Sequence, residues 1–257
     1  MCIFGAGNMG GAVARGLLGH NVIAASDMAI VNPSNRADAI KADYPELTVA
    51  HQAGDLPSKA RYIFIAVKPW ILKSVIDEIK EDFRDDQTVV SVVAGVSCSD
   101  IAGMLGKPEA KVVRLIPNTA ISVGESMTFV AGSVSAYEEA KEIAQMMSVL
   151  GKSLIIEERL MGAATALASC GIAYAFRYIR AASEGGCELG FYADQAKDIV
   201  CQTLKGAIAM IEHNGSNPEA EIDKVTTPGG LTIKGLNTME KNGFSASVVE
   251  GLKASVK

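Results

Sequence analysis

The sequence has little of what several classes of protein and binding site require. Its 257 residues include five cysteines and three histidines with no C-x-x-C pair, so neither a disulfide framework nor a zinc site is indicated. Lysine and arginine are scattered and the net charge is −5, which leaves no basic stripe for a nucleic acid. The odd number of cysteines fits a reducing compartment, and we expect a cytoplasmic protein without a metal.

Long hydrophobic runs are also scarce. The longest, from Met161 to Phe176, is short of a membrane span and is followed by Arg177 and Arg180, so we interpret it as a buried helix and expect no membrane partner. The apolar start is not expected to be a signal peptide, because glycines interrupt it and no basic segment precedes it. A hydrophobic share of 49% and a charged share of 21% are ordinary for a globular chain of one large or two modest domains.

The first residues carry a dinucleotide-binding pattern. A short apolar run, Cys2 to Phe4, leads into Gly5-x-Gly7-x-x-Gly10, and the residues that follow have helical spacing. Gly5 permits a tight turn, Gly7 lets the backbone approach a pyrophosphate, and Gly10 lets helix and strand pack closely. The residues expected to bind the cofactor here are Gly5, Gly7, Asn8, Met9 and Gly10.

The segment after the second expected strand, Met28 to Val31, indicates which nicotinamide cofactor binds. NAD enzymes usually have an acidic residue here for the ribose hydroxyls, but residues 32–36 contain neither Asp nor Glu. A carboxylate would repel a 2′-phosphate, and four side chains here can donate hydrogen bonds to one instead. They are Asn32, Ser34, Asn35 and Arg36. NADP, as NADPH, is therefore favoured over NAD, although the same residues are also typical of a simple turn.

Alternating strands and helices continue to residue 156. Further strands are expected at 47–50, 61–67, 88–94, 112–116, 127–131 and 152–156, with helices at 71–83, 99–105 (capped by Ser99) and 137–150. The residues Ala66, Val67 and Lys68 end an apolar run where ligands bind in open α/β sheets. The expected fold class is therefore α/β, with a Rossmann-like dinucleotide-binding domain at residues 1–156.

Residues 157–257 are expected to form an all-helical domain. Arg159 to Glu184 has the spacing of one long helix and is rich in Gly and Ala, which allows close contact with a helix of a second subunit. We expect Asp194 to cap a helix at 195–213 and Asn217 to start one that ends at Val225. A last helix is expected at 245–255.

The stretch from Val225 to Glu240 carries the most specific pattern. We expect Thr227 to cap a helix that begins at Pro228, because proline at the first helical position has no N–H to lose. Gly229 and Gly230 leave the first-turn amides uncovered, so a carboxylate can approach them and the positive end of the helix dipole. Thr232 adds a hydroxyl. A well-capped surface helix is the alternative interpretation.

This stretch resembles the C-terminal signature of the pyrroline-5-carboxylate reductases, V-T/S-S-P-G-G-T-T followed by a helix and a Glu. The matching residues are Val225, Pro228, Gly229, Gly230, Thr232, Gly235, Leu236 and Glu240. Other segments similar to that family occur in the family's order at residues 5–10, 66–69, 94–96 and 117–119. The resemblance therefore covers essentially the whole chain, with Leu231 replacing a Thr or a small residue.

The resemblance implies reduction of Δ1-pyrroline-5-carboxylate to L-proline with NAD(P)H, the last step of proline biosynthesis. It implies that Thr232 hydrogen-bonds the ring nitrogen. The substrate-binding residues that it implies are Ala94 and Val225 around the ring, and Thr227, Gly229 and Gly230 at the carboxylate. Its implied cofactor contacts are Ala66, Val67, Lys68 and, near the nicotinamide, Asn118. It also implies a homodimer through the helical domain, often stacked into larger rings, with sites built at the subunit contact.

Two other functions fit the same layout. A β-hydroxyacid or 6-phosphogluconate-type dehydrogenase would want a catalytic Lys on the first long helix, and residues 159–184 contain none. Reducing a C=N bond needs less from the protein, because a protonated imine already accepts a hydride. The other alternative is a non-enzymatic NADP-sensing or scaffold protein, which nucleotide binding without imine reduction would support.

Overall fold

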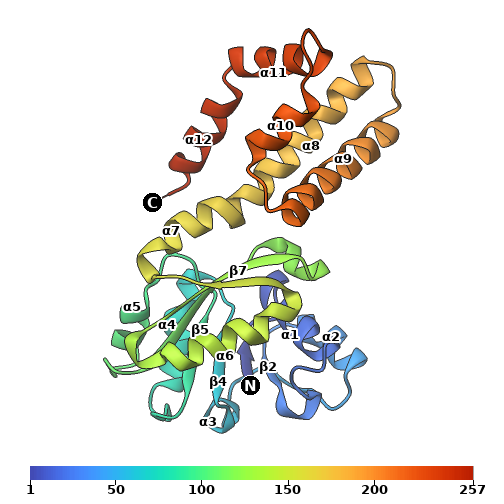
Figure 1. The fold of residues 1–257 in the computed structure, drawn as a ribbon. Helices are drawn as coiled ribbons and strands as arrows, with labels where there is room; N and C mark the ends of the chain where they lie inside the picture. Colours follow the sequence, from blue (N-terminus) through green and yellow to red (C-terminus); the bar gives the residue numbers. More distant parts are fainter. Residues whose placement is uncertain (257) are drawn as a thin grey trace. The chain divides into compact units, whose positions relative to one another are not determined.

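The computed structural model describes residues 1–256, and the chain divides into two compact units, Met1–Ser169 and Cys170–Lys257. The first unit is an α/β sheet domain and the second is entirely helical (Figure 1). The division falls later than the change of pattern at residue 157, because the first turns of the long helical run contact the sheet domain. Ser169 Oγ, for example, donates to Pro117 O at 3.1 Å. The expected fold class is confirmed.

The first unit contains an eight-stranded sheet in the order β3-β2-β1-β4-β5-β6-β7-β8. The strands are β1 Cys2–Phe4, β2 Ala29–Val31, β3 Thr48–Ala50, β4 Tyr62–Ile65, β5 Thr88–Ser91, β6 Lys111–Ile116, β7 Ser126–Gly132 and β8 Gly151–Ile155. Strands β6 and β7 pair antiparallel, and the other neighbours pair parallel. The order reverses direction between β1 and β4, which is the switch point where open α/β sheets bind ligands.

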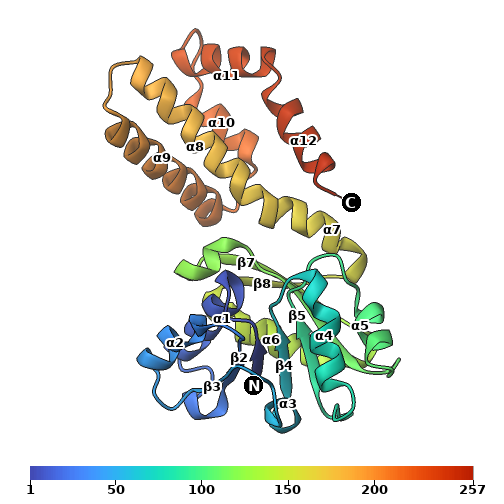
Figure 2. The same ribbon diagram turned by 180° about the vertical axis from the view of Figure 1, so that it is seen from behind.

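Helices cover both faces of this sheet (Figures 1 and 2). They are α1 Asn8–Gly19, α2 Asp38–Asp43, α3 Leu56–Lys59, α4 Pro69–Ile79, α5 Cys98–Met104 and α6 Tyr137–Met147, with short 3-10 turns between elements. One buried cluster joins α1 and α6 to the face that carries Ile3 and Phe64. The other joins α4 and α5 to the face that carries Phe4 and Ile63. Both β4 and β5 are buried along their whole length, and burial on both faces explains the continuous apolar run Tyr-Ile-Phe-Ile in β4.

The helical run after the sheet continues from Glu158 to Glu188. It consists of a 3-10 turn, α7 Met161–Ala164, a π-helical turn at Thr165–Cys170 and α8 Gly171–Glu188. By length and composition this run could cross a membrane, and only 17% of its most apolar window is buried. The expected long helix at 159–184 lies within this run, with a π-helical turn inside it. The expectation that its apolar part is buried is wrong, because much of its surface is uncovered in the single chain.

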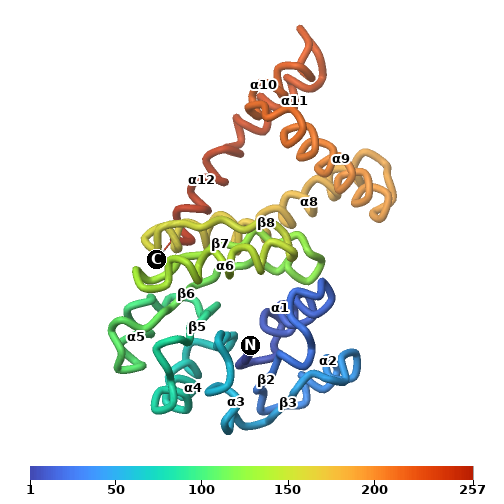
Figure 3. The backbone as a smooth tube through the Cα atoms, turned by 60° about the horizontal axis from the view of Figure 1, so that its bottom comes forward, coloured from blue at the N-terminus to red at the C-terminus, as the bar shows by residue number. Residues whose placement is uncertain are grey.

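The other helices of the second unit are α9 Ala193–Asn214, α10 Pro218–Val225, α11 Leu231–Lys241 and α12 Phe244–Ala254. Helices α8 and α9 pack side by side (Figure 3). Asn217 caps α10 as expected, with its Oδ1 accepting from Glu219 N at 2.9 Å. Two other expected caps are wrong. Tyr192, not Asp194, is the extended residue before α9, and Ser97, not Ser99, caps α5.

Candidate functional site

A cavity of about 1130 Å³ lies at the carboxyl ends of the central strands of the first unit. The glycine turn, the loops after β2 and β3, the end of β4 and the first turns of α4 line it. Its lining includes Gly5, Gly7, Asn8, Met9, Asn32, Arg36, Ala66, Val67, Lys68 and Ala94 from the residues expected to bind ligands. Gly10, Asn35 and Asn118, also expected to bind the cofactor, do not line it.

The three glycines of the turn have different local environments. Gly5 has φ +99°, and a Cβ there would lie 2.5 Å from Ala66 O. A Cβ on Gly10 would lie 2.0 Å from Gly5 O, so Gly10 serves the close packing of α1 against β1 and β4. Gly7 has no heavy atom of the described residues within 4 Å of an added Cβ. A side chain at Gly7 would therefore project into open space, and its absence leaves the backbone open to a ligand.

The N-terminus of α1 opens onto this space. No side chain within residues 1–256 caps it, and Gly7 at the N-cap position is extended. The first amides of a helix have no partner inside the helix and carry the positive end of its dipole. The site therefore suits the pyrophosphate of a dinucleotide.

Asn32 differs from its expected role. Its side chain is buried, its Oδ1 accepts from Ala6 N at 3.0 Å, and its Nδ2 donates to Ser34 O at 2.6 Å and Ser34 Oγ at 2.9 Å. Both amide hydrogens therefore have partners within the protein. The expectation that Asn32 donates to a 2′-phosphate is wrong, because this side chain turns inward and its donors are already used. The sequence could not show this orientation.

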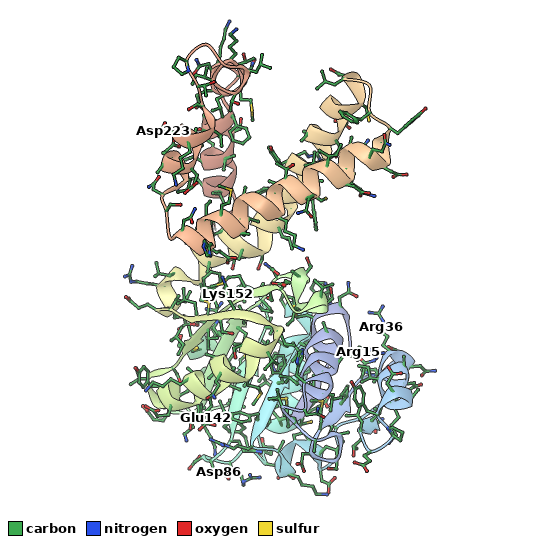
Figure 4. The ribbon with its side chains drawn as sticks, turned by 45° about the vertical axis from the view of Figure 1, so that its right-hand side comes forward. Arg15, Arg36, Asp86, Glu142, Lys152 and Asp223 are labelled. Atoms are coloured by element: carbon green, nitrogen blue, oxygen red, sulfur yellow. The ribbon has the colours of Figure 1, made fainter. Side chains whose placement is uncertain are left out.

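The exposed residues after β2 retain the expected chemistry. Ser34, Asn35 and Arg36 are all exposed, and Asn35 begins a short 3-10 turn outside the cavity. Arg36 lines the cavity as well as a second one of about 710 Å³ beside α1. Figure 4 shows Arg36 and Arg15 on the same side of the first unit. Arg15 is paired with Asp43, which leaves Arg36 as the better candidate for a phosphate.

The loop after β3 contributes residues that the sequence analysis did not identify. His51, Gln52, Ala53 and Gly54 line the cavity, and His51 Nδ1 lies 3.1 Å from Asn32 O. A carbonyl oxygen only accepts hydrogen bonds, so Nδ1 carries the hydrogen and Nε2 is left for other contacts. The sequence could have indicated these four loop residues, because they directly follow a strand of a parallel sheet, where ligands bind.

Lys68 and Asn118 occupy the ends of two other strands. Lys68 is exposed and is the N-cap residue of α4, next to Pro69 at the first helical position. Asn118 Oδ1 accepts from Ala120 N at 3.0 Å, and its backbone N–H donates to Ser126 Oγ at 3.1 Å. Asn118 therefore forms a turn, and its contact with a nicotinamide stays a prediction.

The loop that carries Ala94 is anchored where it enters α5. Glu158 Oε1 accepts from Cys98 N at 2.7 Å and from Arg114 Nη1 at 2.8 Å. The Arg114 side chain is only 11% exposed. Burial raises the pKa of the Cys98 thiol to about 12, so this cysteine is a packing residue rather than a nucleophile. The expected substrate residue Ala94 thus follows β5 on a firmly held segment.

The signature stretch of the second unit forms a turn followed by a helix. Gly230 N donates to Thr227 O at 2.9 Å across Pro228 and Gly229, and Gly229 has φ +70°. Proline followed by glycine with positive φ is the pattern of a type II turn. The expectation that the helix begins at Pro228 with Thr227 as its cap is wrong. Helix α11 begins at Leu231, because the turn occupies the residues that would have formed its first positions.

The turn still presents an uncovered helix end. Gly230 is the N-cap residue of α11, and none of the described side chains caps it. Thr232 is exposed in the first helical turn, and a Cβ on Gly230 would lie 2.5 Å from Thr227 Oγ1. Thr227, Gly229, Gly230 and Thr232 are thus together, as expected, with Val225 at the end of α10. Ala94 belongs to the other unit.

Comparison with known proteins covers both units. The family model for pyrroline-5-carboxylate reductase dimerisation matches residues 158–257, and that for coenzyme F420-dependent NADP oxidoreductases matches residues 1–95. Pyrroline-5-carboxylate reductase 1 of Dictyostelium discoideum is 37% identical over 268 residues, which is 99% of this chain and 48% of that protein. The chain thus spans about half the length of that relative.

Two further similarities extend over nearly full lengths. Pyrroline-5-carboxylate reductase 2 of Dictyostelium discoideum is 34% identical over 272 residues, covering 100% of this chain and 91% of that protein. The crystal structure of Plasmodium falciparum pyrroline carboxylate reductase with NADP bound has a TM-score of 0.88 at 27% identity, covering 99% of this chain and 94% of that one. With matches in both units and a relative covered almost end to end, the chain belongs to the pyrroline-5-carboxylate reductase family.

Proposed function

We propose that this chain reduces the C=N bond of Δ1-pyrroline-5-carboxylate with NADPH, giving L-proline in the last step of proline biosynthesis. The observation that carries the proposal is the turn at Thr227–Gly230, which presents an uncapped helix end next to the hydroxyl of Thr232. This substrate is a cyclic imine that carries a carboxylate, so its binding needs one anion site for the carboxylate and one hydrogen-bonding group for the ring nitrogen. Relatives named for this reaction match nearly the whole chain.

The chain's residues would orient the substrate. The free first-turn amides of α11 hold the carboxylate, and the Thr232 hydroxyl hydrogen-bonds the ring nitrogen of the protonated imine. A bound nicotinamide supplies the hydride that the imine carbon accepts. No strong acid or base is required of the protein, because the protonated imine already accepts a hydride.

The preference for NADPH rests on the residues after β2. Residues 32–36 contain no carboxylate, Ser34 and Arg36 are exposed there, and Arg36 lines the cavity. The pyrophosphate is assigned to the open space at Gly7 and the N-terminus of α1. A 2′-phosphate beside Arg36 gains a charge-assisted hydrogen bond that NADH cannot make.

The test is NADPH oxidation with pyrroline-5-carboxylate by the wild type and by Thr232→Ala. We expect kcat/KM to fall about 10-fold to 100-fold, the value of one or two hydrogen bonds. Thr238→Ala is the control, since Thr238 is an exposed threonine of the same helix whose hydroxyl donates to Lys234 O at 2.8 Å. A wild type that binds NADPH and leaves the imine untouched would instead support an NADP sensor.

The second unit is proposed to form a homodimer. Among its described residues, Ala196 is the only buried hydrophobic side chain, while Phe176, Ile208 and Phe244 are each at least 43% exposed. Residues 158–257 match a dimerisation model. A protein partner fits these exposed apolar side chains better than a bilayer, because the helix that carries Phe176 also carries the Arg180–Glu184 ion pair. Analytical ultracentrifugation distinguishes a monomer, a dimer and a ring of dimers.

The proposed compartment is the cytoplasm. Cys187 and Cys201 are exposed thiols, which persist in a reducing environment and are disfavoured in an oxidising one. Fractionation of the source cells, with immunodetection of the protein, tests this assignment.

A further inference from the structure

We infer that Asn32 sets the direction of the Ser34 hydroxyl and thereby favours a cofactor with a 2′-phosphate. Asn32 is then a positioning residue rather than a phosphate ligand. The inference rests on the proposed binding of NADPH and concerns how the chain distinguishes it from NADH. Its starting point is the buried side chain of Asn32, which bonds the glycine turn on one side and Ser34 on the other.

The orientation of the Asn32 amide is fixed by its partners. Ala6 N–H can only donate, so the atom that faces it must be Oδ1. The Ser34 carbonyl can only accept, so the atom that faces it must be Nδ2. These two bonds determine the rotamer independently of each other. The bond to Ser34 Oγ therefore has a known direction, with Nδ2 donating and Oγ accepting at 2.9 Å.

This direction has a consequence for the hydroxyl hydrogen of Ser34. An amide nitrogen does not accept hydrogen bonds, so the Ser34 hydrogen cannot point at Asn32. Ser34 is exposed, and its hydroxyl is free to donate away from Asn32. An anion beside this loop and Arg36 thus meets a hydrogen-bond donor. A phosphate oxygen accepts such a bond, whereas a ribose 2′-hydroxyl gains less from it because it can also use an acceptor.

An aspartate at the same position would reverse the bond. Its carboxylate could still accept from Ala6 N–H, but it would also accept from the Ser34 hydroxyl, turning that hydrogen inward. It would lose the donor to Ser34 O and place a negative charge near the 2′ position. Residue 32 therefore controls the preference for the 2′-phosphate through Ser34. Because Asn and Asp have the same shape, exchanging them compares an outward with an inward direction of the Ser34 hydroxyl hydrogen.

The experiment is titration calorimetry with adenosine 2′,5′-bisphosphate and with 5′-AMP, which differ only in the 2′-phosphate. We expect the wild type to bind the bisphosphate more tightly and Asn32→Asp to lower the ratio of the two affinities on the order of 10-fold to 100-fold. In a Ser34→Ala background the same change should lower the ratio several times less. This double-mutant cycle separates the effect through Ser34 from direct repulsion by the new charge.

Control variants make each outcome decisive. Asn35→Asp adds the same charge in the same loop without facing Ser34 Oγ, and it should change the ratio less than Asn32→Asp. Equal effects of Asn32→Asp with and without the Ser34 hydroxyl would overturn the inference in favour of direct repulsion. If Asn32→Asp does not fold, Ser34→Ala alone tests the same bond, and an unchanged ratio there overturns the inference.

The same titrations separate this inference from the proposed function. A wild type that binds both nucleotides equally contradicts the proposed NADPH preference itself. A wild type that prefers the bisphosphate but keeps that preference in Asn32→Asp contradicts only the role of Asn32. Thermal unfolding of each variant accompanies the titrations, because a merely structural role would lower the unfolding temperature without changing the affinity ratio.

Discussion

The two units of the chain bury their apolar residues to very different extents. The sheet unit has two large clusters of buried residues, one on each face of the sheet. In the helical unit, Ala196 is the only buried hydrophobic side chain among the described residues. A unit of about ninety residues normally needs a substantial core to be stable. The sheet unit therefore carries its own core, whereas the helical unit leaves most of its apolar side chains for the proposed subunit contact to cover.

In the proposed reaction, the two units have different roles: the first binds the cofactor and the second binds the substrate. The cofactor cavity is lined entirely by residues of the first unit, whose shape is fixed by packing. Thr232 and the turn before it belong to the unit without a core of its own. Dimer formation would therefore stabilise the substrate-binding residues, whereas nucleotide binding would not need it.

The largest expected effect comes from breaking the helical surface. Phe176 of α8 is 61% exposed in the single chain, and Phe176→Glu would place a charge in the proposed subunit contact. We expect the dimer dissociation constant to rise by about 100-fold or more, with loss of imine reduction. Sedimentation velocity across a dilution series measures the dimer dissociation constant. Binding of NADPH by the variant should persist, because the cavity belongs to the first unit.

The matched control lies in the sheet unit. Val134 is fully exposed, so Val134→Glu makes the same kind of change on a surface with no proposed partner. It should leave the sedimentation coefficient and the activity unchanged. Were Phe176→Glu to behave like Val134→Glu, the face of α8 around Phe176 would not be the subunit contact.

The next effect tests the packed core of the sheet unit. Gly10→Ala would bring a Cβ to 2.0 Å from Gly5 O, a backbone atom, and to 2.9 Å from Ala66 Cβ, and neither atom belongs to a flexible side chain that can move aside. We expect the free energy of unfolding to fall by about 2–3 kcal/mol, as for other overpacked sites. Chemical denaturation followed by circular dichroism measures this change.

Gly7→Ala is the matched variant within the same turn. Its Cβ meets no heavy atom of residues 1–256 within 4 Å, so its stability should stay within about 0.5 kcal/mol of the wild type. Its NADPH affinity should nevertheless fall, because the methyl group occupies the space assigned to the pyrophosphate. Equal destabilisation by the two substitutions would show that Gly7 is a packing residue as well.

Much of the sheet unit could be predicted because its signals are local. A strand buried on both faces gives a continuous apolar run, as in β4, and Gly5, Gly7 and Gly10 form a recognisable pattern within six residues. Clustering of the signature residues from Thr227 to Thr232 was predicted for the same reason. Each of these patterns can be recognised within a short stretch of the sequence.

The errors have two physical origins. Pro228 and Gly229 suit either the start of a helix or a type II turn, and the bond from Gly230 N to Thr227 O shows that the chain forms the turn. The expected contact of the Asn32 side chain with the cofactor is wrong because this side chain bonds Ala6, 26 residues away. Nothing in the sequence indicates that bond. Exposure of the long helix likewise depends on what covers it outside the single chain.

The smallest expected effect concerns acid stability at the corner between α9 and α10. Glu221 accepts hydrogen bonds from Lys224 Nζ at 2.7 Å, from Ser216 Oγ and from Asn214 Nδ2 at 3.3 Å. These bonds, that of Lys224 first, lower the pKa of Glu221 to about 2. Because the pKa is lower in the folded state, the stabilisation is complete above the unfolded value of about 4.3 and is lost as pH falls towards 2.

Glu221→Gln should therefore lower the unfolding temperature near pH 6 and converge with the wild type near pH 2. Glu250→Gln is the control, since Glu250 and Lys253 have the same spacing and a 2.8 Å contact but the Glu250 side chain is 68% exposed, against 12% for Glu221. Its unfolding curve should follow the wild type at every pH. Parallel behaviour of both variants would mean that the corner is held by packing alone. A difference confined to Glu221 would show that, in a unit almost without a buried core, one carboxylate with several partners stabilises the corner between α9 and α10.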